Sequence, residues 1–107
     1  GAVFVADYFP GTKSVENDRF VAAFQARYKR PPDNWAALGY TAINVAATAI
    51  KAAGPTPTRE SVRQALTRIK GLPVVLGNGK FSFNDQRNPY YGAIVCTVKN
   101  GKFAVAQ

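Results

Sequence analysis

The sequence predicts an α/β fold made of one strand, three helices and a β-rich tail that ends in a hairpin. A short apolar run at residues 2–6 predicts the strand, and helical periodicity follows between Pro and Gly breaks. From Gly71 onward the periodicity becomes extended. With 107 residues, 47% of them hydrophobic, the chain can bury the core of one small domain.

The first strand and the first helix are predicted from residues 2–30. The continuous apolar run Ala2 to Ala6 is typical of a strand that is buried on both faces in a parallel sheet. Ser14 can cap the helix that follows, and Lys29-Arg30 is suited to its C-terminal end. We expect this helix to bury Phe20, Val21, Phe24 and Tyr28.

Two more helices follow the Pro31-Pro32 break. Asp33 or Asn34 can cap a helix from about Trp35 to Ala53, and its many Ala residues predict that it is wedged between a sheet and another helix. A third helix is expected to begin at Thr58 and to end before Gly71, with Val62, Ala65, Leu66 and Ile69 on its apolar side.

The tail is predicted to be extended at residues 72–76, 80–83, 91–99 and 102–106. Asn100-Gly101 predicts a type I′ hairpin turn, which needs positive φ at both central residues. Gly77-Asn78-Gly79 precedes a strand and does not open a helix, so it is interpreted as a hairpin turn and not as a phosphate loop.

The composition argues against catalysis. The chain has no His and one Cys, which excludes an internal disulfide and a Cys-based metal cage. Its few carboxylates fall mostly at turns and helix starts, where capping explains them. We therefore expect no enzyme activity and no cofactor, and we expect Cys96 to behave as a small buried hydrophobic residue.

The net charge of +8 raises an alternative function. A free-standing basic α/β module could bind nucleic acid or another anionic partner through a helix face carrying Arg59, Arg63 and Lys70. The positive residues are spread along the chain, however, so a solvated surface is favoured and no nucleic-acid partner is expected.

Several segments together resemble a known family. They are the Ala2 to Ala6 strand, the helix ending near Tyr28-Lys29-Arg30-Pro31, the Gly39-Tyr40-Thr41-Ala42 helix, the helix begun by Thr58, and Gly79 to Asn84 with the terminal hairpin. In this order they resemble the branched-chain amino-acid-binding proteins, the type 1 periplasmic receptors of ABC importers. Thr41 stands where that family commonly has Asp, and Asn84 stands where it commonly has Asp after Phe.

The resemblance implies that residues 1–107 are a single fragment of a two-lobed type 1 periplasmic-binding-protein fold, similar to the last third of such a receptor. Residues 1–30 would be a strand and helix of the C-terminal lobe, and 31–71 helices of the N-terminal lobe. Residues 72–107 would form a crossover strand, with Phe81 to Phe83 crossing the hinge, and the terminal hairpin. The absence of Met agrees with the expectation of a processed or excised piece.

Three aromatic residues are candidate ligand contacts. Trp35 follows a Pro-Pro break at a helix start, where its ring can project into a cleft or pack in a core; the resemblance favours a wall of the solute pocket. Tyr8 and Phe9 follow the carboxyl end of a strand, where ligands of open α/β sheets gather. Tyr40 is assigned to packing.

The resemblance also implies a function and partners. The protein would capture an amino acid or similar small carboxylate in the periplasm for the membrane subunits of an ABC transporter. The fragment would depend on the remainder of the parent receptor for binding, and its unpaired strand edges predict self-association.

Overall fold

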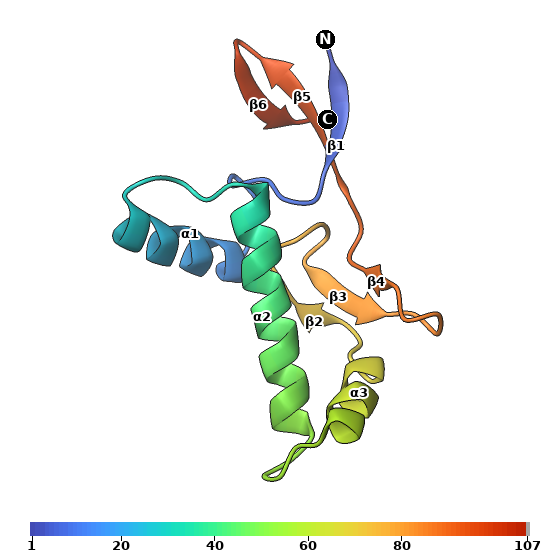
Figure 1. Cartoon of the computed structure of the whole chain (residues 1–107). Helices are drawn as coiled ribbons and strands as arrows, with labels where there is room; N and C mark the ends of the chain where they lie inside the picture. The colour runs from blue at the N-terminus through green and yellow to red at the C-terminus, as the bar shows by residue number, and fades with distance from the viewer. Residues whose placement is uncertain (107) are drawn as a thin grey trace.

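The computed structural model describes residues 1–106 and confirms the α/β class (Figure 1). In chain order the elements are β1 (Val3–Ala6), α1 (Val15–Tyr28), α2 (Asn34–Ala52), α3 (Arg59–Thr67), β2 (Leu72–Pro73), β3 (Lys80–Phe83), β4 (Pro89–Tyr90), β5 (Ile94–Lys99) and β6 (Lys102–Val105).

These elements form two bodies in an elongated molecule of 52 × 33 × 19 Å. The strand body is an antiparallel sheet of order β1-β5-β6. The helical body contains the three helices and the small antiparallel sheet of order β2-β3-β4. In Figure 1 the strand body stands at one end of the molecule, beyond the N-terminal end of α2. The chain passes between the bodies at residues 7–14 and again at 91–93.

Local capping explains where the helices begin. The Ser14 hydroxyl accepts a hydrogen bond from the Asn17 N–H, and the Asp33 carboxylate accepts one from the Ala36 N–H. Thr58 forms a reciprocal capping box with Ser61. Each of these side chains satisfies an amide that the helix itself leaves without an acceptor. The predicted starts of the three helices are therefore confirmed.

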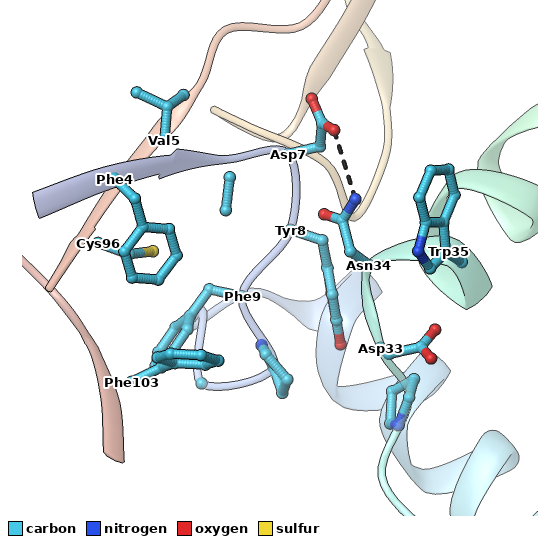
Figure 2. A pocket seen from close by; sticks show the side chains of 14 residues that line it. Phe4, Val5, Asp7, Tyr8, Phe9, Asp33, Asn34, Trp35, Cys96 and Phe103 are labelled. Carbon is cyan, nitrogen blue, oxygen red and sulfur yellow. Dashed lines mark hydrogen bonds between the residues drawn. The ribbon is translucent and has the colours of Figure 1, made fainter. Parts of the chain in front are cut away.

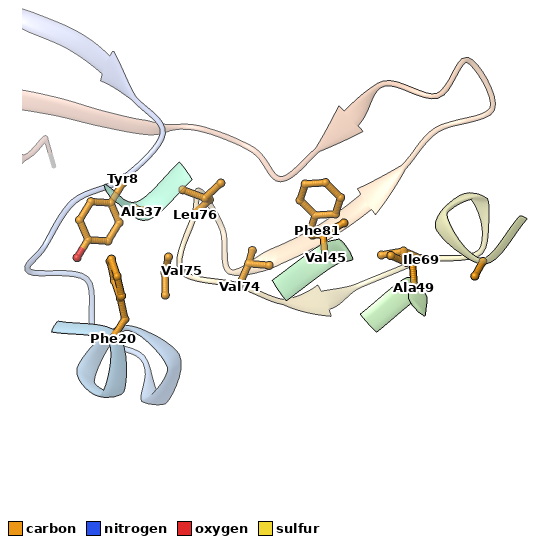
Figure 3. Close-up of a cluster of buried hydrophobic side chains, with 11 residues drawn as sticks. Tyr8, Phe20, Ala37, Val45, Ala49, Ile69, Val74, Val75, Leu76 and Phe81 are labelled. Carbon is orange, nitrogen blue, oxygen red and sulfur yellow. The ribbon is translucent and has the colours of Figure 1, made fainter. Parts of the chain in front are cut away.

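The core lies in the helical body (Figure 3). Leu76 is fully buried at 1% exposure, and Phe20, Val45, Val74 and Phe81 are also buried. The expected apolar side of α1 is only partly correct, because Tyr28 is 54% exposed. The C-terminal end of α1 points away from α2, and the Tyr28 ring contacts neighbours on its own helix: Phe24, at 4.6 Å between ring centroids, and Arg27.

The prediction for α2 is partly correct: the helix contacts α3 and shares the core with the small sheet, but it is buried on one face only. The helix buries one face, which carries Ala37, Thr41, Val45 and Ala49 at every fourth position. Ile43 lies on the other side and is 71% exposed. The expectation arose because a helix with apolar residues nearly all round is usually buried on all sides. Within residues 1–106, α3 contacts α2, and Val45 of α2 shares the core cluster with Phe81 of β3, while the opposite side of α2 stays exposed.

The strand β1 also departs from its prediction. It pairs antiparallel with β5, and Val3 and Val5 are 65% and 69% exposed, so within residues 1–106 it is neither part of a parallel sheet nor buried on both faces. No element within residues 1–106 buries the face that carries these two valines. The opposite face carries Cys96, which is 1% exposed and is confirmed as a buried hydrophobic residue.

Both predicted turns are present. Asn100 and Gly101 have φ of 51° and 72°, which confirms the type I′ geometry of the β5–β6 hairpin. The Gly77-Asn78-Gly79 segment links β2 to β3, with the Gly79 N–H donating to the Leu76 carbonyl at 2.8 Å. Gly77 has φ of 50°, a conformation that glycine adopts without a steric penalty.

The expected lobe boundaries at residues 30 and 72 stay predictions, and the structure shows which elements pack together. The α1 helix packs with α2, where Phe20 stacks on Tyr40 at 4.5 Å between ring centroids, and this confirms the packing role of Tyr40. Phe81 to Phe83 stay in the helical body, since β3 pairs with β2 and β4. The return to the strand body runs instead through residues 91–93.

Gly77→Ala should destabilise the fold by at least about 2 kcal/mol, measured by urea unfolding. A Cβ at Gly77 would lie 1.9 Å from the Tyr91 carbonyl oxygen, and the positive φ adds backbone strain. Gly101→Ala is the matched control, because Gly101 also has positive φ but nothing within 4 Å of its Cβ position. Equal losses in the two variants would mean that the contact with Tyr91 is unimportant.

The chain on its own should self-associate through β1, whose outer edge pairs with no strand in residues 1–106. Sedimentation velocity should show species larger than the monomer as concentration rises. Val5→Lys should reduce the association, whereas Val15→Lys, at an equally exposed position on α1, should not. A compact monomer at all concentrations would contradict this expectation.

Candidate functional site

The end of β1 is the point where the two bodies are tied together. The Gly77 N–H donates to the Asp7 carbonyl, and the Asn78 N–H donates to the Tyr91 carbonyl, both at 2.8 Å. The Tyr91 hydroxyl donates to the Asp7 carboxylate at 3.1 Å, and the Asn34 amide nitrogen lies 3.4 Å from the other carboxylate oxygen. One carboxylate thus connects β1, the start of α2 and the segment that returns to β5.

A cavity of about 650 Å³ opens beside this junction, between the strand body and the N-terminal end of α2 (Figure 2). Five of the 14 residues that line it are aromatic. Phe4, Tyr8, Phe9, Trp35 and Phe103 line it, together with Asp7, Asp33 and Asn34. The structure therefore brings the three predicted residues Trp35, Tyr8 and Phe9 to one cavity, and their contact with a solute stays a prediction.

Trp35 is the most exposed of these aromatic side chains, at 79%. It occupies the first turn of α2, whose start is set by the Asp33 cap and by Pro32, which is buried. The ring is not used by the core, so its large apolar surface is open to the cavity side (Figure 2). An exposed indole at a concave site is typical of a ligand contact.

Tyr8 has a structural role as well as a place on the cavity wall. It is 4% exposed, and its hydroxyl donates to the Asn17 carboxamide oxygen at 2.9 Å. Asn17 in turn donates to the carbonyls of Pro10 and Thr12, which fixes the loop after β1. Burial raises the pKa of Tyr8 from 10.0 to about 12, because the phenolate would lose water. Phe9 lies in this fixed loop and is half-buried.

Sequence reasoning missed Asp7, Asn34, Phe4 and Phe103 as lining residues. Asp7 directly precedes Tyr8 at the carboxyl end of β1, so the argument that selected Tyr8 and Phe9 also applied to it. Phe103 comes from β6 and packs edge to face on Phe4 at 5.2 Å. No local sequence pattern predicts the contact between Phe4 and Phe103, because it depends on the order of strands in the β1-β5-β6 sheet.

The predicted basic face does not form on α3. Arg63 forms an ion pair with Glu60 at 2.6 Å, which offsets its charge locally, and hydrogen bonding to Arg63 lowers the pKa of Glu60 to about 2. Lys70 lies beyond the end of α3, and its ammonium donates to the Phe83 carbonyl.

Residues 1–106 contain no group of three or more His, Cys, Asp or Glu that could hold a metal ion. None of the described helices has the length and apolar content of a membrane span.

A family model described as periplasmic binding protein matches residues 1–102. The chain belongs to the periplasmic binding protein family. This confirms the resemblance found in the sequence. The comparison with curated proteins finds no match.

Solved structures of solute-binding proteins have the same fold over nearly the whole chain. A putative branched-chain amino acid ABC transporter protein from Rhodospirillum rubrum is 28% identical, with a TM-score of 0.83 over 97% of this chain and 30% of its own. A solute-binding protein from R. palustris, solved with benzoate, is 27% identical, with a TM-score of 0.83 over 98% of this chain and 29% of its own. A leucine-binding protein from Thermotoga maritima, 24% identical, shares the fold with a TM-score of 0.83 over 100% of this chain and 30% of its own. The chain thus spans about 30% of the length of these proteins.

Tyr8→Phe should lower stability by about 1–2 kcal/mol at pH 7, since it leaves the buried Asn17 oxygen without its donor. The free energy of unfolding of this variant should also decrease less between pH 7 and pH 11 than that of the parent chain. The raised pKa of Tyr8 means that its stabilising contribution is complete below pH 10 and is lost as pH rises from 10 to about 12.

Urea unfolding at pH 7 and at pH 11 measures both effects. Tyr90→Phe is the control, because Tyr90 is 66% exposed and its hydroxyl has no partner within residues 1–106. Equal pH dependence in Tyr8→Phe and the parent chain would refute the role given to Tyr8.

Proposed function

We propose that this chain is part of the solute-binding component of an ABC importer, which captures an amino acid or similar small carboxylate. The observation that carries the proposal is the aromatic cavity at the junction of the two bodies, with Trp35 exposed on its wall. Membership in the family and the solute-binding relatives support it. The cavity is in the size range of sites for small molecules.

The two bodies support an assignment to two lobes. In the proposal the strand body belongs to one lobe, the helical body belongs to the other, and the segments 7–14 and 91–93 cross between them. In this assignment α1 is placed with the helical body, because Phe20 of α1 stacks on Tyr40 of α2. A solute bound at the junction would contact both lobes and favour the closed arrangement.

The remaining parts of the proposal concern location and partners. The parent receptor acts in the periplasm and delivers its solute to the membrane subunits of the transporter. The remainder of the receptor supplies the rest of the cleft, so the fragment alone does not hold the solute. Trp35, Tyr8 and Phe9 contact the solute through their rings, and the protein catalyses no reaction.

Trp35→Ala in the full-length protein that contains this chain should weaken solute binding at least about 10-fold, because a large aromatic contact is removed. Calorimetry with a panel of amino acids and small carboxylates measures the affinity. Tyr90→Ala is the matched control, since Tyr90 is also exposed but does not line the cavity. Unchanged affinity of Trp35→Ala for every solute that binds would remove this assignment.

A further inference from the structure

The chain contains two Asn-Gly pairs, Asn78-Gly79 and Asn100-Gly101, and both asparagines are exposed to solvent. In such a pair the backbone nitrogen of the glycine can attack the side-chain carboxamide of the asparagine, because glycine has no side chain that hinders the approach. The attack requires that this nitrogen and the carboxamide are free of other bonds. The two pairs differ in this respect, so they can be compared within one molecule.

Hydrogen bonds hold the Asn78-Gly79 pair in place. The Gly79 N–H donates to the Leu76 carbonyl at 2.8 Å. The Asn78 N–H donates to the Tyr91 carbonyl, also at 2.8 Å, and the Asn78 side-chain oxygen accepts from the Lys80 N–H at 3.0 Å. The attacking nitrogen and the carboxamide are therefore both engaged, and a reaction at Asn78 requires local opening of the turn.

The Asn100-Gly101 pair forms the tip of the β5–β6 hairpin and lacks such bonds. Lys99 and Lys102 are cross-strand partners at the base of this turn. Within residues 1–106, neither the Gly101 N–H nor the Asn100 carboxamide makes a hydrogen bond. A Cβ placed on Gly101 would meet nothing within 4 Å. Water and hydroxide therefore reach the reacting atoms freely.

The two lysines beside the turn favour the reaction. Lys99 and Lys102 lie opposite each other and are both exposed, and neither forms an ion pair within residues 1–106. Their positive charges stabilise the amide anion of Gly101 that attacks. A carboxylate in place of the Asn100 carboxamide lies next to both cations and offsets their mutual repulsion.

We propose that Asn100 is a site of spontaneous covalent modification, where asparagine converts to aspartate and isoaspartate while Asn78 stays intact. The Gly101 nitrogen gives its proton to hydroxide and forms a bond to the side-chain carbonyl carbon of Asn100. The bond from that carbon to the amide nitrogen breaks, and ammonia leaves after it takes a proton from water, which restores the hydroxide. Water then hydrolyses the resulting succinimide at either of its carbonyl groups, so water is the only co-reactant.

The modification alters a side chain of the cavity wall. Isoaspartate adds a methylene group to the main chain at position 100, and this turn sets the register of Phe103 opposite Val98. Phe103 packs on Phe4 at 5.2 Å between ring centroids, and both rings line the cavity. A longer turn therefore displaces Phe103 from its packed position.

Peptide mapping by mass spectrometry tests the inference on the full-length protein that contains this chain, stored in neutral buffer for increasing times. Chymotrypsin cleaves after aromatic residues, so the two asparagines fall in separate peptides that end at Phe81 and Phe103. The peptide with Asn100 should gain the mass difference between amide and acid about 10-fold or more faster than the peptide with Asn78, whose hydrogen bonds must open first. Labelling by a methyltransferase specific for isoaspartate should appear in the same peptide.

Two controls isolate the role of the structure. In guanidinium chloride both turns are unfolded, and the two rates should agree within about 3-fold, because each asparagine is followed by glycine. Asn100→Gln lengthens the side chain, so the ring that forms by the same attack is less favourable. The peptide of this variant should keep its mass over the same storage time.

Three outcomes would overturn the inference. The first is equal rates at the two asparagines in the native protein, and the second is an Asn100 that stays intact in the native protein but reacts in guanidinium chloride. The third is a rate difference that persists in guanidinium chloride, because local sequence and not the two turns would then set the rates. None of these measurements involves a solute, so such a failure leaves the proposed function standing.

Discussion

The hydrogen bonds between the Gly77-Asn78 turn and the two chain crossings are the constraint on which the rest of the structure depends. The turn holds Asp7 at the end of β1 and Tyr91 before β5, and both bonds join backbone groups. Gly77 is required there because a Cβ at this position would lie 1.9 Å from the Tyr91 carbonyl oxygen, so no side chain fits. Without this turn, nothing else among the described hydrogen bonds fixes the backbone of both crossings to one point.

The cavity is a consequence of that arrangement. The crossing at Asp7 brings the carboxyl end of β1 to the first turn of α2, so Phe4 and Trp35 reach the same space from different bodies. A site built where two bodies meet changes shape when they move relative to one another. Two short segments, residues 7–14 and 91–93, make the connections between the two bodies in this chain.

Features set by near neighbours in the sequence were predictable. Ser14, Asp33 and Thr58 cap their helices because the donors lie three residues away, and Asn100-Gly101 forms its turn because of its own φ preferences. Burial was predicted less well. Tyr28, Ile43 and the two exposed valines of β1 have apolar side chains that a pattern assigns to a core, yet exposure depends on which elements are present to cover them.

The sequence by itself determined the α/β class, the order of the elements, the turns and the family to which the chain belongs. It also identified three of the aromatic residues that line the cavity, because Trp35, Tyr8 and Phe9 stand at the ends of predicted elements. Tertiary structure decided that α1 packs with α2, that the Tyr8 hydroxyl donates to Asn17, and that Asp7 lines the cavity with its carboxylate bonded to Tyr91 and Asn34. These features join residues that are distant in the chain, and side-chain periodicity reports only relations within a few residues.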